Sequence, residues 1–167
     1  MKIFGLVGMS GSGKTELLVK LIPELIDRGI EVSTIKHTHH KVEIDIPGKD
    51  SYRHRQSGAK QVMVASAGRW SLVHELRDVP EPSLKELLQK LEPVDLVLVE
   101  GFKRGSHDKM EVFRHDHQKD LLAPGDDKIL AVAGDAPIDG LNVPLIDLND
   151  VPAIADFILA HTGLDKG

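Results

Sequence analysis

The 167-residue chain contains no cysteine, and only 4% of its residues are aromatic. The absence of cysteine excludes a disulfide framework, a thiolate zinc site and a thiol nucleophile. With so few aromatic residues, the chain has little to stack against the bases of single-stranded nucleic acid. Its formal net charge of −5 also argues against broad binding to a phosphate backbone. We therefore expect no nucleic-acid partner.

Long apolar runs are absent as well. No stretch approaches the 18 or more apolar residues of a membrane helix, and the apolar run before Gly8 is too short for a signal peptide. These features predict a cytoplasmic protein that does not associate with membranes. The 41% hydrophobic and 28% charged residues are typical of globular chains. The length predicts one domain, residues 1–167.

The most informative motif is the segment Gly-Met-Ser-Gly-Ser-Gly-Lys-Thr at residues 8–15, which matches the phosphate-binding pattern G-x-x-x-x-G-K-[ST]. In this pattern the backbone N–H groups cradle a phosphate, and the following helix adds the positive end of its dipole. We expect Lys14 to reach the β- and γ-phosphates and Thr15 to bind Mg²⁺. The predicted nucleotide-binding residues of the loop are Gly8, Ser10, Gly11, Ser12, Gly13, Lys14 and Thr15.

Apolar segments of strand length alternate with helical patterns around this motif. Strands are expected at residues 3–7, 31–35, 94–99, 109–114 and 128–133, a hairpin at 61–65 and 70–76, and helices at 17–28, 50–59, 83–91 and 150–161. The spacing predicts that Asp50 or Ser51 caps the second of these helices. The alternation predicts a three-layer α/β P-loop NTPase fold, with a largely parallel sheet and helices on both faces.

A second acidic feature ends the strand at residues 94–99. Glu100 follows this apolar strand, as the acidic residue of a Walker B segment does, at the sheet edge where ligands bind. We expect Glu100, with Lys14, to act in catalysis by binding Mg²⁺ or polarising a water on the ion. The predicted metal set is Thr15, Glu100 and Asp45 or Asp50; a strand-end carboxylate that is only solvated is the alternative for Glu100.

Histidines and charged residues follow the strand at residues 31–35. His37, His39 and His40 can bind a divalent metal, or can face solvent or phosphate in a polar loop. The next stretch offers Lys49, Arg53 and Arg55, which suit the tail of a large anionic ligand. The alternative for that stretch is an exposed helix with mixed charges.

Together these motifs resemble the molybdopterin-guanine dinucleotide biosynthesis adapter family, MobB. The matching segments are residues 8–15, 35–40, 47–51, 55–59, 64–66, 69–70, 95–103 and 146–151. The resemblance implies a P-loop protein that binds GTP and Mg²⁺ with weak intrinsic GTPase activity. It also implies a homodimer that partners the guanylyltransferase of molybdenum cofactor synthesis and aids delivery of nucleotide or finished molybdopterin cofactor. The candidate cofactor or partner loop consists of His37, His39, Lys49, Asp50 and Arg55.

Guanine recognition has no local signature, because the chain lacks the Asn-Lys-x-Asp sequence of most GTPases. Asp135, after a predicted strand, can offer a carboxylate to the guanine N–H donors, and Asn149 is the alternative. No Gln or Arg is evident in cis to assist hydrolysis, which favours a slow reaction.

Two other functions remain open. A metal-insertion GTPase would use the histidines at residues 37–40, although related metal chaperones carry Cys-His motifs that this chain lacks. A small-molecule kinase would bind its acceptor hydroxyl with residues 36–55 and turn over at roughly 1–100 per second.

Overall fold

The computed structural model describes residues 1–38, 42–116 and 120–165. The chain forms two compact units, Met1–His37 with Glu86–Gly167, and Thr38–Lys85. The prediction of a single domain stays a prediction.

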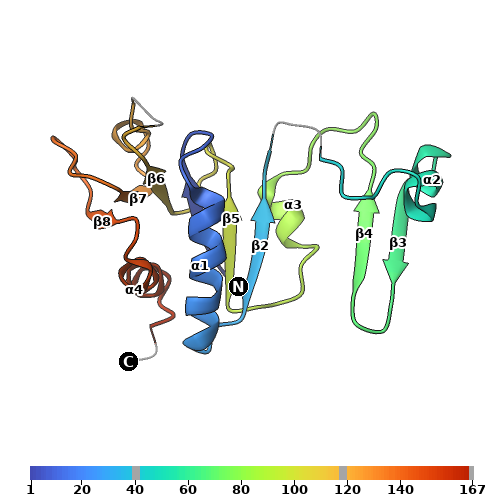
Figure 1. The fold of residues 1–167 in the computed structure, drawn as a ribbon, viewed down its shortest axis with the longest axis horizontal. Coiled ribbons are helices and arrows are strands. Elements are labelled where there is room, and N and C mark those ends of the chain that lie inside the picture. The colour runs from blue at the N-terminus through green and yellow to red at the C-terminus, as the bar shows by residue number, and fades with distance from the viewer. Residues whose placement is uncertain (39–41, 117–119, 166–167) are drawn as a thin grey trace. The chain divides into compact units, whose positions relative to one another are not determined.

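The larger unit is built on a six-stranded sheet in the order β2-β5-β1-β6-β7-β8 (Figure 1). All five strand pairings are parallel, and β1 lies in the middle between β5 and β6. The strands are β1 (Lys2–Val7), β2 (Val32–Lys36), β5 (Leu96–Glu100), β6 (Lys109–Phe113), β7 (Ile129–Gly134) and β8 (Leu145–Asp147). The predicted α/β class and parallel sheet are confirmed, while β8 is an addition that the sequence pattern did not indicate.

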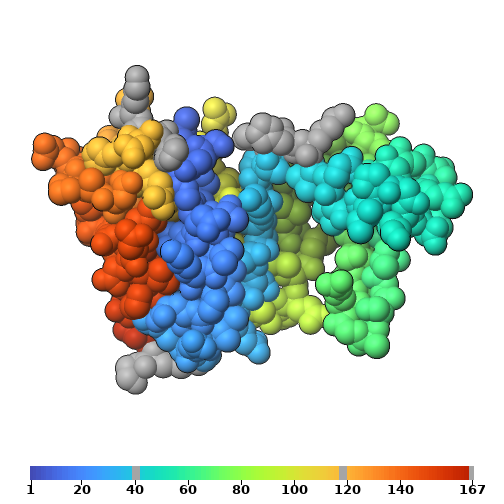
Figure 2. All heavy atoms as spheres, viewed as in Figure 1, coloured from blue at the N-terminus to red at the C-terminus, as the bar shows by residue number. Residues whose placement is uncertain are grey.

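Two helices, α1 (Lys14–Asp27) and α4 (Val151–Thr162), pack together over one face of this sheet. Figure 2 shows their atoms meeting along the visible face, α1 in blue and α4 in red. The apolar stripe of α1 buries Leu21 and Leu25 completely, which contributes about 1.5–3 kcal/mol for each side chain. The helix continues through Pro23 and ends at Asp27; Arg28 is its cap residue, and Gly29 after it adopts a positive φ of 76°. None of the helices in the described ranges has the length and apolar character needed to cross a membrane.

The opposite face, over β1 and β6, is covered by chain connections. Residues 101–108 join β5 to β6, and residues 114–128 join β6 to β7. Parallel strands are usually joined by a helix, but the described parts of these two connections hold only the 3₁₀ turn η1 (Ala123–Gly125). The first connection lies so close to β1 that a Cβ on Gly5 would be 2.5 Å from His107 Nε2.

The smaller unit contains α2 (Asp50–Gln56) and a hairpin of β3 (Gln61–Ala65) and β4 (Trp70–His74). The hairpin is antiparallel, as predicted, and α2 contacts β3. The predicted cap is wrong: the helix begins at Asp50, and its cap position is Lys49, which makes no side-chain capping bond. The helix α3 (Leu84–Leu88) is shorter than predicted, because the chain continues in single turns such as Lys90 N–H to Leu87 C=O.

Candidate nucleotide-binding site

The phosphate-loop segment connects the end of β1 to the start of α1. Gly8 has a φ of 148°, and a Cβ there would lie 2.4 Å from the Val112 carbonyl oxygen. Gly13 takes the left-handed conformation at the cap of α1, with no side chain capping the helix. The first N–H groups of α1 are therefore left for an external acceptor, as at an anion-binding helix end.

Lys14 folds back over this loop. Its Nζ donates to Met9 O at 2.7 Å, Gly8 O at 3.2 Å and Ser12 Oγ at 3.3 Å. Burial lowers the pKa of Lys14, and nearby Lys103 and Lys36 lower it further, while Glu100 opposes them. A bound phosphate would favour the charged ammonium.

The predicted metal residues Thr15 and Glu100 lie together. The Thr15 hydroxyl donates to Glu100 Oε1 at 3.0 Å, and the Glu100 side chain is only 11% exposed. A hydroxyl and a carboxylate are the oxygen ligands that Mg²⁺ prefers, and Mg²⁺ usually completes its shell with water and substrate phosphates. This hydroxyl–carboxylate pair fits the ion, although the described residues contain no group of three or more His, Cys, Asp or Glu side chains that could hold a metal.

Asp45 belongs to the smaller unit. Its carboxylate, 7% exposed, accepts from Arg55 Nε at 3.0 Å. Its binding to Mg²⁺, like that of Asp50, stays a prediction.

Two lysines that the sequence analysis did not assign also lie at the loop. Lys36 Nζ is 3.1 Å from Glu100 Oε1 and 3.3 Å from Thr15 Oγ1. Lys103 Nζ is 3.5 Å from Met9 Sδ. The only sequence signal for Lys36 is its place as the last residue of β2. Its position beside Glu100 can be inferred only when the strand order is known.

The first histidine of the predicted metal segment lies close to the site. The His37 ring packs on the Phe102 ring with centroids 4.4 Å apart, and the His37 N–H donates to Glu100 O at 2.8 Å. Phe102 has a positive φ of 49°, so the chain turns sharply just after Glu100. His39 and His40 lie outside the described residues.

The candidate guanine-reading residues both make local bonds. Asp135 follows β7, and its Oδ1 accepts the backbone N–H of His115 at 3.1 Å while the side chain stays 26% exposed. Asn149 Nδ2 donates to Asp147 Oδ1 at 3.2 Å. Guanine recognition by either residue stays a prediction.

Arg55 of the candidate cofactor or partner loop is held by carboxylates within the smaller unit. Arg55 forms ion pairs with Asp45, Glu43 and Glu75, and its side chain is 12% exposed. The hydrogen bonds that Arg55 donates to Asp45, Glu75 and Glu43 raise its pKa. Lys49 and Asp50 are exposed at the start of α2.

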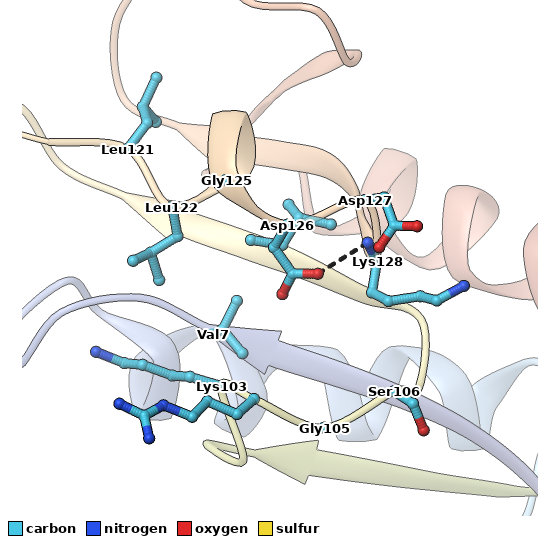
Figure 3. Close-up of a pocket in the computed structure, with 12 residues that line it drawn as sticks. Val7, Lys103, Gly105, Ser106, Leu121, Leu122, Gly125, Asp126, Asp127 and Lys128 are labelled. Carbon is cyan, nitrogen blue, oxygen red and sulfur yellow. Dashed lines mark hydrogen bonds between the residues drawn. The ribbon is translucent and has the colours of Figure 1, made fainter.

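A pocket of about 730 Å³ opens between the two chain connections on the sheet face opposite α1 (Figure 3). Its lining includes apolar Val7, Leu121 and Leu122, with Lys103 and Lys128 toward opposite ends of the view. Lys103 thus lies between this pocket and the phosphate loop.

Comparison with known proteins gives one consistent family. The pattern of MobB, molybdopterin guanine dinucleotide synthesis protein B, matches residues 3–135. The molybdopterin-guanine dinucleotide biosynthesis adapter protein of Escherichia coli K12 is 47% identical over 154 residues, covering 90% of this chain and 87% of that protein. The Haemophilus influenzae protein of the same name is 46% identical over 159 residues, covering 93% and 86%.

A solved structure agrees with these relatives. The crystal structure of molybdopterin-guanine biosynthesis protein B (mobB) superposes with a TM-score of 0.75 at 28% identity, over 95% of this chain and 99% of that one. The sheet, the loop at residues 8–15 and these matches confirm the α/β P-loop-type fold. The chain belongs to the MobB family of molybdopterin guanine dinucleotide synthesis proteins.

Proposed function

We propose that this chain is a GTP-binding adapter in the formation or delivery of molybdopterin guanine dinucleotide, with weak GTPase activity. The observation that carries the proposal is the meeting of Lys14, Thr15 and Glu100 at the phosphate-loop segment of a MobB-family chain. Its relatives are named adapter proteins of this pathway.

In this proposal the N–H groups of residues 10–13 and the start of α1 hold the β- and γ-phosphates. Lys14 leaves the loop carbonyls to pair with the phosphate oxygens. The Thr15 hydroxyl and Glu100 carboxylate hold Mg²⁺, directly or through water, and the ion when bound neutralises charge on the phosphates. Asp135 is proposed to accept from the guanine N–H groups.

The second ligand is proposed to be the molybdopterin part of the cofactor, with the cofactor or partner loop contributing to its binding. Lys49 and Asp50 are exposed, whereas Arg55 fixes the loop through its ion pairs. The guanylyltransferase of the pathway is the proposed protein partner, and the cytoplasm is the proposed location.

A homodimer is part of the proposal. The hairpin leaves Met63, Val64, Trp70 and Leu72 exposed. A two-stranded sheet is marginally stable by itself, so a second copy of this chain packing on the hairpin would bury this surface. We expect sedimentation to give the mass of a dimer. Trp70→Ser should reduce this mass to that of a monomer, and Val19→Ser should leave it unchanged.

Calorimetric titration with GTP and, separately, ATP tests the nucleotide assignment. We expect a preference for GTP with Mg²⁺, and a loss of about 10–100-fold in affinity in Lys14→Ala, since a charge-assisted bond contributes about 1.5–3 kcal/mol. Lys20→Ala removes a lysine from an exposed position of the same helix and should bind normally. Retained affinity in Lys14→Ala would contradict the assigned site.

The alternatives predict different results in the same experiment. Equal or stronger binding of ATP, with transfer of phosphate to an added small molecule, would favour the kinase. Tight binding of a divalent transition metal that requires His37 would favour the metal-insertion GTPase.

A further inference from the structure

The strand register places Lys36 directly beside Glu100. In the parallel pairing of β2 with β5, Lys36 is the partner of Glu100, and Ile35 is the partner of Val99. Both residues end their strands at the sheet edge that carries the phosphate loop. The position of Lys36 is therefore fixed by the sheet and does not depend on a loop conformation.

Lys36 closes a triangle with the two proposed magnesium ligands. Its ammonium lies 3.1 Å from Glu100 Oε1 and 3.3 Å from Thr15 Oγ1, and those two oxygens are 3.0 Å apart. The ammonium thus contacts the same two oxygens that would hold the metal ion.

A nearly buried carboxylate needs a cation, and Lys36 supplies one here. The Glu100 side chain is 11% exposed, and an unpaired charge in such a place is costly. Lys14 does not take this role, because its ammonium is bonded to Met9 O, Gly8 O and Ser12 Oγ. The Lys36 side chain is 56% exposed, so its ammonium can leave Glu100 without disturbing the core.

We propose that Lys36 is a movable cation of the phosphate site. Without nucleotide, Lys36 holds the Thr15–Glu100 pair; with Mg²⁺ and GTP bound, it gives up these oxygens and pairs with the terminal phosphate. Two cations on one carboxylate oxygen repel each other, and bound GTP would bring a new anion, its γ-phosphate, to this site. This inference rests on the proposed GTP binding.

On the γ-phosphate, Lys36 stabilises the charge of hydrolysis from within the chain. Water adds to the γ-phosphorus, the bond to the β–γ bridging oxygen breaks, and GDP, phosphate and a proton leave. A cation positioned on the transferred phosphoryl group is the role that an arginine finger has in other GTPases. No Arg or Gln for this role is evident in the sequence, and Lys36 fills it.

Two measurements on Lys36→Met and Lys36→Arg test the proposal. The first is the Mg²⁺ concentration needed for half-maximal GDP binding, a readout that does not depend on turnover. Lys36→Met removes the competing cation, so we expect about a 3–10-fold lower Mg²⁺ requirement with GDP affinity retained at saturating Mg²⁺. The second is single-turnover GTP hydrolysis, which we expect to fall about 100–1,000-fold in Lys36→Met, since loss of one electrostatic donor typically costs about 10²–10³ in rate.

Lys36→Arg keeps the charge and should hydrolyse GTP within about 10-fold of the wild-type rate. Lys2→Met is the matched control, because Lys2 is an exposed lysine of β1, at the end of this strand away from the phosphate loop. An unchanged Mg²⁺ requirement and rate in Lys36→Met would overturn the inference while leaving GTP binding intact. Loss of GDP binding at every Mg²⁺ concentration would also overturn it, because Lys36 would then be a simple binding lysine. Wild-type protein that binds no guanine nucleotide would overturn the proposed function and the inference together.

Discussion

Alternate residues of β6 point to opposite faces of the sheet, and the two sets differ in chemistry. Met110 and Val112 face α1 and α4 in the apolar core. Lys109 and Glu111 face the chain connections and are equally buried, with no exposed surface. One sheet therefore packs against helices through apolar area on one side, and against loops through charged groups on the other.

A crossover helix would satisfy its own backbone N–H and C=O groups. On this face, buried charged side chains bond to the backbone of the two connections instead. Lys109 Nζ donates to Gly105 O and Asp126 Oδ2, each at 2.7 Å, and thereby joins both connections. Glu111 accepts the N–H groups of Leu122 and Ala123 at about 2.9 Å. Loops expose backbone polar groups that a helix satisfies internally, so a face covered by loops needs buried charged partners.

The largest effect is expected from Lys109→Met, which keeps the length of the side chain but removes the ammonium. Asp126 and the Gly105 carbonyl would lose their partner, and breaking a buried ion pair on one side costs about 3–5 kcal/mol. Urea unfolding measures the change. Lys103→Met, at an exposed position of the same pocket, should change stability by less than about 0.5 kcal/mol.

The double variant Lys109→Met with Asp126→Ala sharpens this result. Removing both partners leaves no unpaired carboxylate, so part of the loss should be recovered. If the double variant loses more stability than the two single variants lose together, the result would contradict the conclusion that charge pairing, and not packing, stabilises this face.

The apolar face is tested by Leu25→Ala, with an expected loss of about 2–5 kcal/mol from the cavity that it leaves. Leu25 is fully buried in the core, whereas its neighbour Ile26 is 56% exposed. Ile26→Ala is therefore the matched control on the same helix and should have little effect. Equal losses from the two variants would contradict the assigned orientation of α1.

Gly5→Ala tests the close contact between β1 and the connection at residues 101–108. The added methyl group would lie 2.5 Å from His107 Nε2 and 2.8 Å from Lys109 Cβ, which no relaxed structure tolerates. Overpacking of this kind costs about 1–3 kcal/mol. In a His107→Ala background, Gly5→Ala should lower the free energy of unfolding by less. If the losses from the two substitutions are additive, the His107 ring is not what excludes a side chain at position 5.

The sequence predicted those features that depend on neighbouring residues. The loop at residues 8–15, the strand before it and the amphipathic α1 all have local signals, and the structure contains the same elements. The role of Lys36 could not be found in this way, because it depends on β2 pairing with β5, far away in the chain. The burial of Lys109 is hidden for the same reason: charged residues on a strand usually face water, and only the tertiary structure supplies Asp126.

The smallest effect concerns pH. His107 lies between Gly5 and Gly105, and neither ring nitrogen has a hydrogen-bond partner among the described residues. Burial lowers the pKa of His107 below 6.5, and Lys109 lowers it further, while Asp108 and Asp126 act in the opposite direction. Between the folded pKa and about 6.5 the unfolded chain binds more protons than the folded one, so the free energy of unfolding falls as the pH drops through this window.

His107→Phe keeps a flat ring but cannot bind a proton, and its stability should fall less between pH 7.5 and pH 5 than that of the wild type. The comparison uses the pH dependence of each protein and not its absolute stability, so a packing change caused by the larger ring does not obscure the result. Proton NMR of the His107 ring gives the pKa directly, and a value above 6.5 would contradict the prediction. A depressed value would show that the loop-covered face, unlike the helix-covered one, weakens in mild acid, since a positive charge on the His107 ring would be desolvated and would lie beside Lys109.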